Sequence, residues 1–205
     1  IYDTGGAYRG GFNMAEAVLY PFFKRANQYD IDYLVLSHLD NDHAGGRYWL
    51  ERHLNIDKTI EPSSGCSIGH KRLWAGLSMT VLWPLSPVSG HENDHSCVLR
   101  ISNGENTVLL SGDIEKDSEH AIVKKYQHSG LLKADILLAP HHGSNTSSSD
   151  EFVNAVQAKK VIFSAGYNNR WSFPKPEIEQ KYRATQAHTF STGIEGRISI
   201  NLQDL

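Results

Sequence analysis

The sequence predicts a mixed α/β fold with both hairpins and crossover helices. Short strand-like and helix-like stretches alternate along the chain, which is the pattern of layered α/β domains. Residues 71–84 and 96–113 each show two strand-like runs around a turn, with Gly76 at the first turn and an Asn-Gly pair in the second. The chain is long enough to bury a core, and we expect a single domain over residues 1–205.

The other elements are predicted from apolar spacing and from residues that begin or end helices. Residues 13–27 favour a helix that starts in a box-like way, with Asn13 as the cap and Glu16 three residues later, and that Pro21 kinks or divides. The apolar run 32–37 suits a strand buried on both faces. Further strands are expected at 134–140, 160–166 and 197–202, and further helices at 115–128, 150–157 and 175–184.

The composition excludes some classes of protein. With a net charge of −3 the chain has no basic footprint for nucleic acid, so a phosphate-rich partner must be held by something other than general attraction. No run approaches the roughly 18 apolar residues of a membrane span, and no signal-peptide layout opens the chain. The opening "IYD" resembles the end of a strand, and we therefore expect a fragment of a longer protein.

The stretch "LVLSHLDNDHAGG" (34–46) places costly polar side chains directly after a buried strand. They are His38, Asp40, Asp42 and His43. Burying so many ionisable groups is expensive unless they pair or bind a metal, and imidazole and carboxylate suit zinc, manganese or iron. Gly45 and Gly46 would take backbone angles that other residues avoid and fold the loop back tightly. The alternative, a solvated polar turn with two incidental histidines, fits this specific pattern less well.

Two more apolar runs end in the same way. "VLLSGD" ends in Asp113, and "ILLAPHHGS" ends in His141 and His142. Three strands thus deliver acidic or imidazole groups at their C-terminal ends, where open α/β sheets build their sites. The three endings together predict a metal-dependent hydrolase.

At these residues the chain resembles the metallo-β-lactamase superfamily. "HLDNDH" (38–43) looks like its signature loop, with aspartate in place of the usual second histidine. The blocks "DTGG" (3–6), "NDHSCVLRI" (93–101), "LLSGDIE" (109–115), "PHHGS" (140–144) and "SAGYNNRWSFPKPE" (164–177) follow in the order of the C-terminal domain of ComEC, the DNA-uptake channel family of naturally competent bacteria. The resemblance spans nearly the whole chain and implies an αββα four-layer sandwich that lacks its first strand or two.

The resemblance implies a site for two divalent metal ions, zinc or manganese. His38 and Asp40 would bind one ion. Asp42 and His43 would bind the other. Asp113 would bridge the two ions, because a carboxylate has two oxygens.

Three further positions take roles from the same resemblance. His141 is the first choice to complete the shell of the second ion, and His142 is the alternative ligand or a proton donor to the leaving group. Asp3 would orient the signature loop from behind. Asp42 and His142 are the candidate catalytic residues.

The chain departs from the superfamily in two places. A histidine usually precedes the strand near residue 96, and here Asn93, Asp94 or His95 would stand in, with Asp94 favoured as the metal ligand. The last superfamily histidine is missing from "SAGYNN" (164–169). We therefore expect a site that holds its metals loosely or holds only one.

The candidate substrate-binding residues are Ser144, Asn168 and Arg170. Arg170 lies on a loop that should face the site, where it would meet phosphate bidentately. Trp171 on this loop is the exception among four tryptophans that otherwise suit core and edge packing. The segment "SNTSSSD" (144–150) is by default a flexible loop or helix cap, with a lid over substrate as the less favoured alternative.

The function that the resemblance implies is metal-dependent hydrolysis of DNA during uptake, which degrades the strand that is not imported. The partners would be single-stranded DNA and the rest of an inner-membrane channel protein, with this domain facing the periplasm. On residue counts alone two unrelated thiols are slightly favoured; a periplasmic location would strengthen the alternative, a Cys66–Cys97 disulfide, and the choice stays open. Two alternatives stay open: a catalytically degenerate metal-binding module that guides DNA, and a small-molecule hydrolase.

Overall fold

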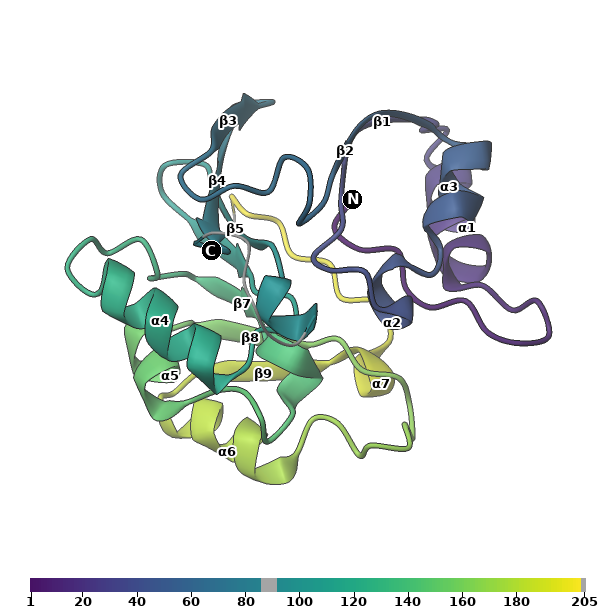
Figure 1. Cartoon of the computed structure of the whole chain (residues 1–205). Helices are drawn as coiled ribbons and strands as arrows, with labels where there is room; N and C mark the ends of the chain where they lie inside the picture. The colour runs from purple at the N-terminus through teal and green to yellow at the C-terminus, as the bar shows by residue number, and fades with distance from the viewer. Residues whose placement is uncertain (86–91, 204–205) are drawn as a thin grey trace.

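Two β-sheets pack face to face, with helices on their outer sides (Figure 1). A computed structural model describes residues 1–85 and 92–203 of the chain. Val35 and Ile60 of the smaller sheet pack in one apolar cluster with Met79, Val81 and Leu99 of the larger sheet. Burial of these side chains between the sheets is the main force that joins them. The result is the helix–sheet–sheet–helix sandwich that the resemblance implies.

The smaller sheet consists of two parallel strands, β1 (Asp30–Val35) and β2 (Asn55–Ile60). Four short helices accompany it: η1 (Ala15–Leu19), α1 (Tyr20–Arg25), α2 (Asn41–Ala44) and α3 (Arg47–His53). The buried side chains Ala15, Ile31 and Leu50 join η1, β1 and α3 in one core cluster. In Figure 1, α1 and α3 lie on the side of this sheet that faces away from the larger sheet.

Within the described residues the larger sheet has seven strands, in spatial order β3 to β9. They are β3 (Lys71–Trp74), β4 (Leu77–Trp83), β5 (Val98–Ser102), β6 (Thr107–Leu110), β7 (Ile136–Leu138), β8 (Lys160–Phe163) and β9 (His188–Ser191). Neighbouring strands are antiparallel from β3 to β6 and parallel from β6 to β9. Because β6 to β9 are parallel, their C-terminal ends lie at the same edge of the sheet. Functional sites of α/β proteins form at such an edge.

Three helices cover the outer face of the parallel half (Figure 1). They are α4 (Lys116–Tyr126), α5 (Asp150–Val156) and α6 (Pro176–Ala184), and the short elements η2 (Glu92–His95), η3 (Pro140–Gly143) and α7 (Thr192–Glu195) complete the chain. Ile122, Phe152 and Tyr182 from the three helices bury themselves on Leu109 and Val161 of the sheet. Of the helices in residues 1–85 and 92–203, none has both the length and the apolar character of a membrane span.

Both predicted hairpins are confirmed. Strands β3 and β4 pair with Trp74 opposite Leu77, which leaves a two-residue turn at Ala75 and Gly76. Both turn residues have positive φ, 48° and 81°, the conformation that matches the twist of a hairpin. Strands β5 and β6 form the second hairpin around residues 103–106.

The predicted strand at 197–202 is wrong. These residues form no ladder, and the last strand of the sheet is β9 at His188–Ser191. A crossover through α6 brings residues 188–191 alongside β8 first, so the place for a parallel strand is already taken when the chain reaches 197.

The predicted helix over 13–27 runs without a break from Met14 to Arg25, and its hydrogen-bond pattern changes just before Pro21. The π-helical turn η1 ends at Leu19, and α1 starts at Tyr20 with Pro21 in its first turn. The Asn13 side chain accepts a hydrogen bond from Ala15 N at 2.9 Å. Among the described residues Glu16 returns no bond to it, so the start is a single cap and not a reciprocal box.

Cys66 and Cys97 form a disulfide. Cys66 follows β2 of the small sheet and Cys97 precedes β5 of the large one, and both lie in the apolar cluster between the sheets. The bridge therefore fastens the two sheets to each other, close to the strand end that carries His38.

Candidate metal centre

The first histidine stretch leaves β1 and turns at once into a short helix. His38 is buried three residues beyond the end of β1, and α2 begins directly after Asp40. The amides of His43 and Ala44 donate to the Asp40 carbonyl, which closes the helical turn. Asp42 and His43 are thereby held close to His38 beside the end of the strand.

Gly45 and Gly46 are required for a reason other than the one expected from the sequence. Their φ values are −59° and −82°, angles that any residue adopts. A side chain has no room, because a Cβ on Gly45 would meet Asn41 O and lie 2.5 Å from Ala7 N. A Cβ on Gly46 would lie 2.7 Å from Thr4 O. Close packing of the N-terminal segment against α2 explains the two glycines.

Asp113 follows β6 and reaches the site through a glycine. Gly112 has φ +56°, and a Cβ there would lie 2.8 Å from Ser96 and 2.9 Å from the Cβ of Ser37. The Asp113 amide donates to Ser96 Oγ at 2.9 Å. The glycine thus lets β6 approach the end of β1, so that a carboxylate from the large sheet meets histidines from the small one.

The second histidine stretch has a strained backbone. His141 and His142 have φ values of 45° and 56°, in the left-handed region that residues with side chains rarely adopt. His142 Nδ1 lies 2.7 Å from Ser164 O. A carbonyl only accepts, so Nδ1 carries a proton, and Nε2 is the ring nitrogen that faces the site. No side-chain pattern could have revealed Ser164, because its contribution is a backbone oxygen.

These strand ends bring together two overlapping groups of ligand atoms. His38, His43 and Asp113 form one group, with all atoms within 4.8 Å of one another; Asp42, His43 and His142 form the other. His43 Nε2 lies 3.2 Å from Asp113 Oδ1 and 3.2 Å from His142 Nε2. His142 Nε2 lies 3.3 Å from Asp113 Oδ2 and 3.6 Å from Asp42 Oδ2. Asp113 thus directs one oxygen toward each histidine.

Asp3 fixes the position of the first histidine stretch through hydrogen bonds. Its carboxylate accepts from Ser37 N at 2.6 Å and from Ser37 Oγ at 2.8 Å. It also lies 2.8 Å from His43 Nδ1, which fixes the tautomer that leaves His43 Nε2 free for the site. The position is the one expected for a residue that orients the loop.

The electrostatics favour positive charge at the centre of the site. Burial opposes protonation of His43, but hydrogen bonds to Asp113 and Asp3 outweigh it and raise its pKa to about 11. Burial also opposes protonation of His142, and the carboxylates of Asp113 and Asp42 raise its pKa to about 9. Burial raises the pKa of Asp113, but the same contacts hold it well below its usual range. The carboxylates therefore stabilise cationic partners between them.

The protonation state of His38 also favours a cation in the site. Burial lowers its pKa, and the charge of His43 lowers it further. The Ser37 hydroxyl donates to Asp3, so it accepts from His38 Nδ1 at 3.0 Å and leaves Nε2 unprotonated. That Nε2 is buried without a hydrogen-bond partner among the described residues. A buried lone pair beside carboxylates fits a divalent metal ion.

Asp40 and His141 lie at the edge of these groups. Asp40 is exposed, with Oδ2 3.7 Å from His38 Nε2. His141 Nδ1 faces Glu115 at 3.1 Å and Thr146 at 3.0 Å, and its Nε2 is 3.9 Å from Asp113 Oδ2. The structure thus brings His142 among the ligand atoms and leaves His141 beside them, although His141 was the first choice from the sequence.

Asp94, the favoured stand-in for a missing histidine, is engaged elsewhere. Its Oδ1 accepts from Ser118 Oγ at 2.6 Å, at the start of α4. The neighbouring His95 has a buried Nε2 without a partner among residues 1–85 and 92–203. His95 and His38 line the same cavity of about 460 Å³. Of the three alternatives that the sequence left open, His95 is the one whose side chain has a buried polar atom without a partner among the described residues.

The candidate substrate-binding residues differ in their access to the site. Ser144 is buried, and its Oγ bonds within its own loop to Thr146. Asn168 and Arg170 are exposed on the loop that follows β8. The segment 144–150 is not a lid, because Ser149 caps α5 and its amide and that of Ser148 donate to buried Glu119.

A cavity of about 220 Å³ opens onto the site. Its lining includes Asp42, His43, Asp113 and His142, so both groups of ligand atoms are reached from it. The remaining wall is largely apolar and comes from the N-terminal segment and the end of β7. The combination of a few polar groups in an apolar cleft is typical of active sites.

The chain belongs to the metallo-β-lactamase superfamily, whose family model matches residues 1–166. The superfamily consists generally of metal-dependent hydrolases, and its fold implies divalent metal binding. Among solved structures, the metallo-β-lactamase fold protein YhfI from Bacillus subtilis matches with a TM-score of 0.54 at 14% identity, over 92% of this chain and 82% of that one.

The resemblance to the ComEC family is confirmed by curated relatives. The chain is 33% identical to recombination protein 2 of Haemophilus influenzae, over 98% of this chain and 26% of that protein. It is 30% identical to competence protein ComA of Neisseria gonorrhoeae, over 98% of this chain and 29% of that protein. The chain therefore spans less than a third of the length of these relatives.

Proposed function

We propose that this domain is a metal-dependent phosphodiesterase that cleaves DNA during uptake and degrades the strand that is not imported. The observation that carries the proposal is the pair of overlapping ligand groups at the floor of an accessible cavity. Relatives named as recombination and competence proteins support DNA as the substrate. The net charge of −3 supports local cations, rather than a basic surface, as the source of attraction for phosphate.

The metal ligands are assigned from the two groups together with Asp40, which lies at their edge. His38 and Asp40 would hold one ion. Asp42 and His43 would hold the other, with His142 completing its shell and Asp113 between the two. When bound, divalent ions supply a water of lowered pKa and neutralise charge on the attacked phosphate.

The chain's own residues position the reacting groups. Asp42 is the carboxylate of the second group, and its side chain is 49% exposed and can reach substrate. His142 is fixed by Ser164 O and offers Nε2 toward the cavity; in the alternative to binding the second ion, this atom would give a proton to the leaving oxygen. Asp3 keeps His43 in the tautomer that the site needs.

The Cys66–Cys97 disulfide supports a location outside the reducing cytoplasm. We place the domain on the periplasmic side of an inner-membrane channel protein, of which this chain would be one part. Single-stranded DNA and the rest of that protein would be its partners.

The proposal is tested with labelled single- and double-stranded DNA and added manganese or zinc. We expect cleavage by the wild type and a loss of about 1000-fold in Asp113→Ala and Asp42→Ala, because several kcal/mol of charge stabilisation disappear. The exposed Asp117 on α4 offers a control, Asp117→Ala. Absence of cleavage with either metal, or variants as active as the wild type, would overturn the proposal.

Two measurements separate the alternatives. Rapid turnover of a chromogenic lactam would favour a small-molecule hydrolase over a nuclease. Metal analysis that finds one fully coordinated, inert ion would favour a module that only guides DNA.

A further inference from the structure

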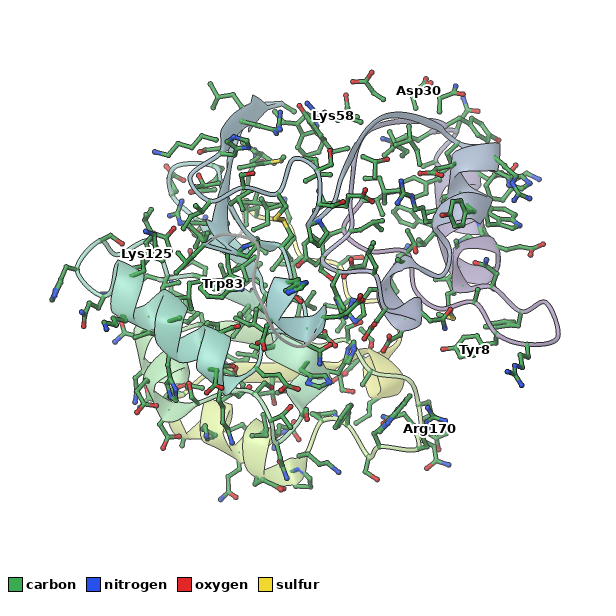
Figure 2. All side chains as sticks on the ribbon, viewed as in Figure 1. Tyr8, Asp30, Lys58, Trp83, Lys125 and Arg170 are labelled. Carbon is green, nitrogen blue, oxygen red and sulfur yellow. A yellow bond between two sulfur atoms is a disulfide. The ribbon has the colours of Figure 1, made fainter. Side chains whose placement is uncertain are left out.

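Two loops rise from the walls of the cavity that holds the ligand groups. Gly5 and Met14 both line it, so residues 6–13 form a loop on one wall. Ser164 also lines it, so residues 165–175 leave from another wall. Figure 2 labels Tyr8 on the first loop and Arg170 on the second, and both project toward the same side of the molecule in this view.

The second loop carries a ladder of planar groups that starts in the site. The ring of Phe173 stacks on His142 with centroids 6.4 Å apart and planes 24° apart. Trp171 continues the ladder, 6.2 Å from Phe173 and 10° from its plane. The guanidinium of Arg170 lies 4.1 Å from the Trp171 ring centre. The ladder ends in solvent, because Trp171 is 50% exposed and Arg170 is exposed.

The loop is held in this shape by its own polar contacts. The Asn169 side chain donates to Gly166 O at 3.0 Å and to Phe173 O at 2.7 Å, and it accepts from Phe173 N at 2.9 Å. Lys175 Nζ donates to Trp171 O at 2.7 Å. An exposed tryptophan is therefore presented on a braced loop, so little ordering entropy is lost when a ligand stacks on it.

The first loop offers similar chemistry. Tyr8 and Phe12 are each 54% exposed, with ring centroids 6.0 Å apart, and Arg9 lies between them in sequence. Neither Arg9 nor Arg170 forms an ion pair with any residue in 1–85 and 92–203. Each loop thus combines exposed aromatic rings with a guanidinium that no carboxylate of the described residues neutralises.

We propose that the two loops grip a nucleic-acid strand with unpaired bases: one base replaces the guanidinium of Arg170 on the ring of Trp171, another stacks on Tyr8, and Arg170 and Arg9 contact phosphates. This inference rests on the proposed function and names the form of its substrate. Exposed aromatic rings stack on any base, and unpaired guanidinium groups match a repeating anion. Bases inside a duplex are already stacked and cannot occupy the ladder, so the loops select single strands.

The test compares kcat/KM on oligothymidylate with kcat/KM on an abasic oligomer of the same length and charge, with manganese. The wild type is expected to prefer oligothymidylate about 10-fold. Trp171→Leu should bring the two substrates within about twofold through a higher KM for oligothymidylate, and Trp171→Phe should restore most of the preference. Trp74→Leu, on β3 and 37% exposed, is the matched tryptophan control.

Arg170→Gln provides a second variant that leaves Trp171 in place. It should lower kcat/KM on both oligomers equally and reduce the slope of log kcat/KM against log salt by about 0.7. A wild type that cleaves both oligomers equally, or a Trp171→Leu variant that keeps the preference, would overturn this inference and leave the proposed function standing. A wild type that cleaves neither oligomer would overturn the proposed function and this inference with it.

Discussion

The two histidine stretches that meet at the site, 38–43 and 141–142, are held in opposite ways. The first has ordinary backbone angles, and a single carboxylate, Asp3, orients His43 from behind. The second has a left-handed backbone, and a carbonyl, Ser164 O, orients His142. The comparison teaches that the orientation of His43 depends on one side chain that a mutation can replace, whereas the orientation of His142 depends on how the surrounding backbone packs.

The largest expected effect separates the two adjacent histidines of the second stretch. His142→Gln should lower DNA cleavage and metal affinity about 100-fold or more, because its Nε2 lies among the ligand atoms. His141→Gln should cost less than about 10-fold, since its ring faces Glu115 and Thr146. Isothermal titration with manganese and a cleavage assay measure both. A stronger loss in His141→Gln would reverse the assignment.

The next largest effect is expected from Asp3→Asn, which changes the carboxylate that orients His43 in the first stretch. Asparagine tolerates the φ of +58° at this position and still accepts from Ser37 N. Its NH₂ group would face His43 Nδ1, however, and force the proton onto Nε2. We expect a loss of about 30-fold in metal affinity with little change in thermal stability. Asp57→Asn, an exposed change on β2, is the control, and equal affinity in the two variants would contradict the role of Asp3.

A stability measurement tests why the first stretch contains its glycines. Gly45→Ala should lower the free energy of unfolding by about 2 kcal/mol, because the new methyl group meets backbone atoms that cannot move aside. Gly166→Ala, where nothing lies within 4 Å, should change it by less than about 0.5 kcal/mol. Equal denaturation midpoints for the two variants would show that the N-terminal segment packs elsewhere.

The smallest effect lies at the opposite end of the parallel strands. Burial raises the pKa of Asp135, but hydrogen bonds from Lys159 and Thr107 N outweigh it and lower that pKa. Its ionised form therefore stabilises the fold above its unfolded pKa of 3.8, and the stabilisation is lost as pH falls through the lower folded value. Asp135→Asn should lower the free energy of unfolding by about 1 kcal/mol at pH 7, where the exposed Lys159 adds little, and by less near pH 2. Denaturation at both pH values measures this, and an equal cost at both would contradict it.

Much of the site was predictable because ionisable residues directly follow apolar strands. His38, His43 and Asp113 were recognised in this way, and their strand ends do converge. The choice between His141 and His142 was not predictable. It depends on the positive φ values of both residues, which turn the two neighbouring rings in different directions.

One error in the fold has an equally local cause. The strand expected at 197–202 has the right composition, but β9 occupies the position beside β8. Asp94, the favoured stand-in for a histidine of the superfamily, stays a prediction, and Ser118 on α4, distant in sequence, donates to its Oδ1.

By itself the sequence determined the α/β class, both hairpins and the chemistry of the metal site, because apolar periodicity and the type of ligand are local properties. The tertiary structure alone decided which imidazole enters the site, which tautomer each ring holds, and which loops flank the cavity. Those outcomes depend on contacts between residues far apart in the chain, such as Asp3 with His43 and Ser164 with His142, and local patterns carry no record of them.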